Sequence, residues 1–367
     1  MNNQKEQVSS ASLMFTIGCF IQSSTLVVGY ITGVAKQDTW LTVIFGFIVA
    51  LPIIWIFAAL GEKFPGKNLI EINDVVFGKI PGKIISVLYI FFFFSLTFLN
   101  SGVMTDFVSS SLLPDTPDIA VLIMFIGVCG YAVRKGLETM TRYSLIFIII
   151  VSVVLIINSL LLIKDMRLDN FQPSFTYPLK NYIQATNEVS ILSFGNIVVF
   201  FMFFSSLKTP SQIKKPLFGG LIIGAATMIF ISARDIAVLG PIIRMITIPA
   251  YDAVRLINLA NTLTRMEILY AGILLMMLFF KISVLYYATV RAIAQIFNMK
   301  SYKLLVPVIG VLIIIFAYNA FDSSAENSYN AANIAPIYQT LFEVILPLVT
   351  LIVASIRGFR KPVGANI

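Results

Sequence analysis

The chain has 367 residues, of which 58% are hydrophobic and 12% are charged, and its mean hydropathy is +0.91. A soluble domain carries about 25% charged residues, so the composition excludes an ordinary soluble protein and predicts an integral membrane protein. The net charge of +8 does not indicate nucleic-acid binding, because an excess of Lys and Arg is typical of the inner loops of membrane proteins. The absence of His excludes imidazole metal sites and Ser-His-Asp catalysis.

Ten apolar stretches have about the length that a membrane-spanning helix needs. The loops between them are short, so we expect one transmembrane domain over residues 1–367. Lys and Arg are about twice as frequent on the side of the N-terminus as on the other side, which predicts that both termini are cytoplasmic. The predicted spans cover residues 12–35, 40–60, 83–109, 118–134, 140–163, 188–207, 216–238, 265–296, 303–320 and 335–356.

The first predicted span is interrupted by polar residues at mid-depth. Non-helical backbone is tolerated there only where it is buried in protein or lines a cavity, and free backbone N–H groups at such a break attract anionic groups such as carboxylates. Hydroxyl side chains that bond the preceding turn would give the same pattern without a ligand. We therefore predict that a ligand site includes four consecutive residues, Gln22, Ser23, Ser24 and Thr25.

The sixth predicted span contains a comparable interruption. Five spans precede it, an odd number, so the second half of the chain (about 188–356) enters the membrane with the orientation opposite to the first half (about 12–163). This arrangement predicts a 5+5 inverted repeat whose interrupted first and sixth helices meet near the midplane. The second half of the predicted ligand site is Ser193, Phe194, Gly195 and Asn196, and third-span residues at similar depth, Thr97, Phe98 and Ser101, complete it.

Lys281 lies in the middle of the eighth span, two residues before Ser283. A charge at this depth is costly, so we expect it to face the bundle interior and to have a function. It is either a fixed cation, a group that titrates and couples movement to protons, or a structural residue that bonds broken-helix carbonyls. Glu343 is the only acid of comparable depth, but it is placed nearer the surface and no pair with Lys281 is predicted.

Residues 249–260 form an amphipathic segment between the seventh and eighth spans. Pro249 marks a helix start, and Val254 and Ile257 face away from Asp252 and Arg255. Such a helix either folds over a cavity as a lid or lies on the lipid surface. The sequence leaves both arrangements open.

Three stretches resemble a known family. They are GKNLIEINDVVFGKIPGKIISVLYI (66–90), TIPAYDAVRLINLANTLTRMEIL (247–269) and FKISVLYYATVRAIAQIFNMKSY (280–302). They are similar to the B subunit of Ger-type germinant receptors of bacterial endospores, the endospore germination permease family of the amino acid–polyamine–organocation superfamily. The resemblance extends essentially from Ser10 to Arg360.

The resemblance implies a LeuT-type fold and residence in the spore inner membrane, beside a larger membrane A subunit and a lipoprotein C subunit. It also implies recognition of a small nutrient germinant, often an amino acid, by the interrupted first and sixth spans. Lys281 would be the eighth-span lysine of this family. Many members are expected to carry an acid directly after the glycine of the SFG run, where this chain has Asn196.

Three functions remain open on the sequence alone. The first is a germinant-sensing subunit that binds an amino acid-like ligand, the second is a proton-coupled amino acid permease, and the third is an ion or water conduit opened by partner subunits. Fold does not distinguish them. We expect no enzyme activity, no cofactor and no metal site, because no nucleophile–base pair or metal-ligand cluster is present.

Overall fold

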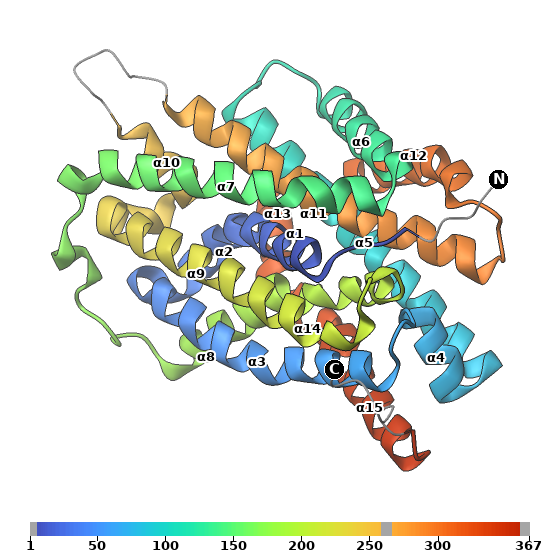
Figure 1. The fold of residues 1–367 in the computed structure, drawn as a ribbon. Coiled ribbons are helices and arrows are strands. Elements are labelled where there is room, and N and C mark those ends of the chain that lie inside the picture. The colour runs from blue at the N-terminus through green and yellow to red at the C-terminus, as the bar shows by residue number, and fades with distance from the viewer. Residues whose placement is uncertain (1–5, 258–265, 360–367) are drawn as a thin grey trace.

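The computed structural model describes residues 6–257 and 266–359, and within these ranges every regular element is helical. The one β-type contact in the described chain is an isolated parallel bridge between Val8 and Leu207. Figure 1 shows the helices as a bundle with α1 near its centre. Residues 258–260 of the predicted amphipathic segment and residue 265 of the predicted eighth span lie outside the described residues.

The first half of the chain contains seven α-helices and two short 3₁₀ helices among the described residues up to Leu161. Its elements are α1 (Ser10–Gln22), η1 (Ser23–Val27), α2 (Val28–Ala35), η2 (Lys36–Asp38), α3 (Thr39–Lys63), α4 (Leu69–Phe77), α5 (Lys79–Ser111), α6 (Asp118–Lys135) and α7 (Leu137–Leu161).

The second half begins after a connection with two 3₁₀ turns, η3 (Ile163–Asp165) and η4 (Leu168–Phe171). The elements up to the eighth span are α8 (Leu179–Val189), η5 (Ser190–Phe194), η6 (Gly195–Ser206), η7 (Pro210–Gln212), α9 (Lys214–Leu239), η8 (Gly240–Met245), α10 (Pro249–Arg255) and α11 (Met266–Ile296). The remaining elements are η9 (Tyr302–Leu304), α12 (Leu305–Tyr318), α13 (Ser324–Tyr329), η10 (Asn330–Ile334), α14 (Ala335–Thr340), η11 (Leu341–Ile345) and α15 (Leu346–Ile356).

Seven helical stretches of the described chain are long and apolar enough to cross a membrane, and Tyr302–Tyr318 is a shorter apolar helix. Every predicted span contains helix, but the number ten stays a prediction. Helices α6 and α12 do not meet the same measure of length and hydropathy, and one stretch, Val28–Lys63, covers the end of the first predicted span together with the second. The outward faces of the long helices carry exposed apolar side chains, among them Trp55, Phe91, Ile123, Ile149 and Ile352. Such faces are stable only in lipid, and the chain is a multi-pass membrane protein.

The interior of the bundle is organised around the first span. Helix α1 packs against α9, α7 and α11. The two helices approach closely at Gly220 and Gly224 of α9, where a Cβ would overlap the side chain of Ile17 or Ile21. Small residues at four-residue spacing let membrane helices approach in this way.

Helix α10 folds onto the bundle, since five of its seven residues are buried. It packs against α9 and α11, and the Arg234 guanidinium of α9 donates to the Ala250 carbonyl of α10 at 3.4 Å. Arg234 also forms a buried ion pair with its neighbour Asp235 at 2.6 Å. Of the two predicted arrangements, the structure therefore favours the lid that folds over the bundle, and not the helix that lies on the lipid surface. It also places Arg234 inside α9, within the predicted span 216–238.

Candidate functional site

The first interruption is a 3₁₀ turn, η1, between α1 and α2, as the polar sequence predicted. The four side chains of residues 22–25 are buried, and all but Thr25 form hydrogen bonds with protein atoms. Gln22 Nε2 donates to Thr227 of α9 at 3.0 Å, and Ser23 Oγ donates to the Phe20 carbonyl at 2.6 Å. Thr25 Oγ1 has no partner among the described residues. Neighbouring helices thus hold the break in place, and the Thr25 hydroxyl is left without a hydrogen-bond partner in the described chain.

The second interruption is larger and changes helix type twice. A π-helical turn, η5, is followed by the twelve-residue 3₁₀ helix η6. Phe194 packs edge-on against Phe47 of α3, with ring centroids 6.4 Å apart, and Ser193 Oγ is buried without a partner in the described chain. A π-turn inside a helix frequently marks a functional site.

Lys281 lies inside the bundle with 2% of its surface exposed. Its Nζ bonds Ser24 Oγ at 2.8 Å, so the eighth span contacts the first span at the break. The amine also lies over the Phe20 ring, 5.3 Å from its centroid. Lys281 is therefore a cation placed at the edge of η1.

Glu343 is completely buried, with 0% exposure, contrary to the shallower position that the sequence suggested. Asn196 Nδ2 donates to its Oε1 at 2.8 Å and also lies 3.0 Å from Gln339 Oε1. Glu343 interacts electrostatically with Lys281, but no direct ion pair joins them in the described chain. Its Oε2 lies against Gly195, where any Cβ would overlap it. The sequence did not predict Glu343 as a site residue, because its hydrogen-bond partner Asn196 lies 147 positions away along the chain.

A central cavity of about 70 Å³ lies between the two interrupted spans, α5, α11 and the segment of span ten. Asn196 and Lys281 line it together with four further amide side chains and Tyr30. A cavity needs at least about 10–15 Å³ to hold one water molecule, which occupies about 30 Å³ in the liquid, so this cavity has room only for a very small ligand. The amides that the sequence did not predict as site residues are Asn100, Asn327, Asn330 and Gln339.

The other predicted site residues lie around this cavity and do not line it. Thr97 and Ser101 bond carbonyls of their own helix α5, at 2.7 Å each. Phe98 lines a separate, mostly apolar groove of about 620 Å³ between α5, α12 and α14. Ser283 is buried beside Cys129 of α6. The structure thus brings Asn196 and Lys281 together at the cavity wall, with Ser24 directly behind Lys281.

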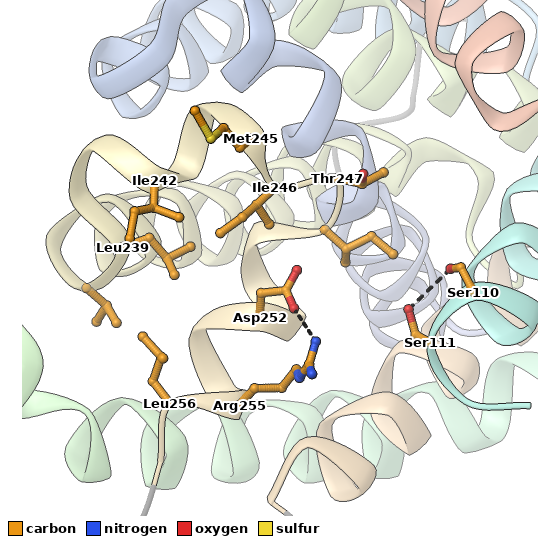
Figure 2. A pocket seen from close by; sticks show the side chains of 12 residues that line it. Ser110, Ser111, Leu239, Ile242, Met245, Ile246, Thr247, Asp252, Arg255 and Leu256 are labelled. Atoms are coloured by element: carbon orange, nitrogen blue, oxygen red, sulfur yellow. Dashed lines mark hydrogen bonds and ion pairs between the residues drawn. The ribbon is translucent and has the colours of Figure 1, made fainter. Parts of the chain in front are cut away.

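A larger cavity of about 610 Å³ lies under α10, next to η8 and the end of α5. Figure 2 shows aliphatic and polar side chains in its lining, with the Asp252–Arg255 ion pair at one side. It contains no residue of either interruption. Neither Lys281 nor Asn196 lines it, so it matches the predicted ligand site less well than the central cavity does.

Two solved structures have similar folds. One is Mhp1, a nucleobase-cation-symport-1 family transporter in a closed conformation with bromovinylhydantoin bound. Its TM-score is 0.68 at 13% identity, over 96% of this chain and 80% of that one. The other is MhsT in complex with L-phenylalanine, with a TM-score of 0.64 at 12% identity over 97% of both chains. This similarity shows a transporter fold of the LeuT type.

Similar sequences come from Bacillus subtilis (strain 168). Spore germination protein KB is 26% identical over 98% of this chain and 97% of its own length. The putative spore germination protein YfkT is 24% identical over 88% and 89%. The family model described as spore germination protein matches residues 7–325. The chain is therefore a member of the spore germination protein family, as the resemblance had indicated.

Proposed function

We propose that the chain is the nutrient-recognising subunit of a spore germination receptor and binds a small amino acid in the central cavity. Membership of the germination family supports the role, and the transporter fold supports a midplane ligand site. The observation that carries the proposal is Lys281, a buried cation that lines a small cavity together with several amide side chains, between the two interrupted spans.

The cavity favours a small ligand with a carboxylate. Lys281 is the single charged side chain in the lining, so an anionic group would pair with its amine. The amide oxygens of Asn196 and Gln339 would accept hydrogen bonds from the ligand's ammonium group. About 70 Å³ suits glycine, L-alanine or L-serine, whereas larger amino acids require the lining to move.

The rest of the assignment follows the family resemblance. We place the protein in the spore inner membrane with both termini on the cytoplasmic side. A larger membrane subunit and a lipoprotein are its proposed partners. Its role is ligand binding and signalling, without catalysis and without a cofactor.

Equilibrium binding to purified, reconstituted protein tests the proposal, with the twenty amino acids as the panel. We expect glycine, L-alanine or L-serine to bind most tightly and Lys281→Ala to weaken that binding at least about tenfold, since a charge-assisted hydrogen bond contributes about 1.5–3 kcal/mol. Lys303→Ala, which changes a lysine outside the cavity, serves as the control. Failure of the wild-type protein to bind any of the twenty would refute the proposal.

A proton-coupled amino acid permease is the second candidate. The observation that favours it is the presence of two buried ionisable groups, Lys281 and Glu343, beside a transporter-type cavity. Proteoliposomes with an inward-directed proton gradient distinguish the two. Accumulation of labelled L-alanine above its outside concentration indicates the permease, and binding without accumulation indicates the receptor subunit.

A further inference from the structure

A second polar cavity, of about 200 Å³, lies between α8 and the segment that leads into the tenth span. Its lining contains one acid, Glu188, which is only 1% exposed. Gln184 Nε2 donates to Glu188 Oε1 at 3.0 Å, whereas Glu188 Oε2 is buried without a partner in the described residues. A buried carboxylate oxygen with no donor or cation beside it is costly, and either protonation or a bound ligand relieves that cost.

The other polar groups of this cavity are amides whose oxygens are available. Gln184 uses its nitrogen on Glu188, and Asn333 uses its nitrogen on the Tyr329 carbonyl at 3.0 Å. The oxygens of both side chains therefore remain as acceptors, and Asn187 supplies a third amide. No Lys or Arg is part of the lining. Carboxylate and amide oxygens form the donor set that hard metal cations prefer.

The cavity shares two structural segments with the central cavity. On the segment of η10 and α14, Asn330 and Gln339 line the central cavity, whereas Asn333 and Pro336 line the second one. On the sixth span, Asn196 lines the central cavity and Glu188 lines the second one. A ligand in either cavity would thus contact helices that also form the wall of the other. The π-helical turn η10 lies within this shared wall.

We propose that Glu188 and its surrounding amides form a binding site for a monovalent alkali cation, Na⁺ or K⁺. One carboxylate balances one positive charge. Calcium sites usually gather more than one acid, and the described residues contain no cluster of three or more acidic, His or Cys side chains. The exposed Asn187 and Asn333 place the opening at the protein surface.

Thermal unfolding of the purified full-length protein in detergent tests this site without any nutrient. The protein is compared in about 100 mM NaCl, KCl or choline chloride at equal ionic strength. We expect Na⁺ or K⁺ to raise the unfolding temperature by about 2 °C or more over choline, because a ligand that binds the folded state stabilises it. Glu188→Gln keeps the side-chain shape and should abolish the difference, while Asp322→Asn, at an exposed acid outside the cavity, should retain it.

Equal unfolding temperatures in the three salts would overturn the proposal, as would a full salt effect in Glu188→Gln. A larger increase with millimolar CaCl₂ than with either alkali salt would overturn the monovalent assignment. Asn333→Ala provides a second variant, for which we expect a smaller cation effect because one amide oxygen is lost.

The shared wall predicts coupling between the cavities, and this step rests on the proposed function. We expect replacement of choline by the stabilising cation to tighten L-alanine binding about fivefold or more, within the usual range of coupling between sites. An unchanged affinity would overturn the coupling and leave the cation site. Absence of L-alanine binding in every salt would count against the proposed function, while the unfolding data would still decide the cation site.

Discussion

The two interrupted spans differ in how neighbouring helices hold them. The first is a five-residue 3₁₀ turn in which Ser23 and Ser24 form hydrogen bonds and Thr25 does not, and a cation, Lys281, contacts it through Ser24. The second extends over a π-turn and a long 3₁₀ helix, and an acid, Glu343, contacts it through Asn196. The two breaks therefore have opposite charges beside them.

This difference suggests how a small cavity distinguishes the ends of a zwitterion. The cation lines the cavity directly, but the acid lies behind Asn196 and Gln339. An ammonium group would thus meet neutral amides first, and a carboxylate would meet the full charge of Lys281. The arrangement favours one orientation of an amino acid, and the following variants test the contribution of each break.

Lys281→Met should have the largest effect, because it removes the cation from the first break and leaves Glu343 without its opposite charge. Loss of one partner of a directly bonded buried pair costs about 3–5 kcal/mol. Lys281 and Glu343 interact without a direct ion pair, so we expect a loss of about 3 kcal/mol, the lower end of that range, in denaturant unfolding. The double variant with Glu343→Gln should recover part of it, and equal stability of the single and double variants would contradict electrostatic coupling between the breaks.

Gly195→Ala should disturb the second break by about 2 kcal/mol, because its Cβ would overlap Glu343 Oε2 and overpacking of a closed interior typically costs 1–3 kcal/mol. The matched control is Gly33→Ala beyond the first break, where a Cβ meets nothing within 4 Å. Thermal unfolding of both variants gives the comparison. Equal unfolding temperatures would show that Glu343 can move away from Gly195.

Ser24→Ala should weaken the first break by about 1.5 kcal/mol, since Lys281 loses one hydrogen bond but remains in place. Amino acid binding should fall less than it does in Lys281→Met. A loss of binding as large as that of Lys281→Met would show that the position of the amine, and not its charge alone, determines recognition.

Phe98→Ala should have the smallest effect on binding, less than about twofold. Phe98 lines the separate groove between α5, α12 and α14 and not the central cavity. Binding of L-alanine by the reconstituted variant measures this. A loss of tenfold or more would return Phe98 to the ligand site that the sequence predicted.

Much of the fold could be predicted from the sequence because lipid imposes length and hydropathy on each span. The break at Gln22–Thr25 was also visible, since a run of polar residues at mid-span is costly in contact with lipid and indicates a buried irregular segment. The extent of the second break could not be predicted, because the 3₁₀ geometry continues from Gly195 to Ser206 through ordinary apolar residues. Only packing against neighbouring helices determines that geometry.

The site was harder to predict than the fold. Many members of the family are expected to carry an acid directly after the glycine of the SFG run, where this chain has Asn196. The structure supplies an acid at the same place from the tenth span, as Glu343. Contacts between residues 147 positions apart leave no signal in a single sequence. The amides of residues 327–339 were missed for the same reason.

The contacts of the N-terminal segment constrain the order in which the protein can fold during synthesis. Val8 pairs with Leu207, and Glu6 accepts hydrogen bonds from Tyr287 at 2.6 Å and Tyr302 at 3.2 Å. These two tyrosines leave the ribosome long after Glu6 does, by roughly 15–60 s at 5–20 residues per second. The first residues to be synthesised are thus among the last to reach their final contacts. Completion of this end of the bundle must wait until nearly the whole chain has been inserted.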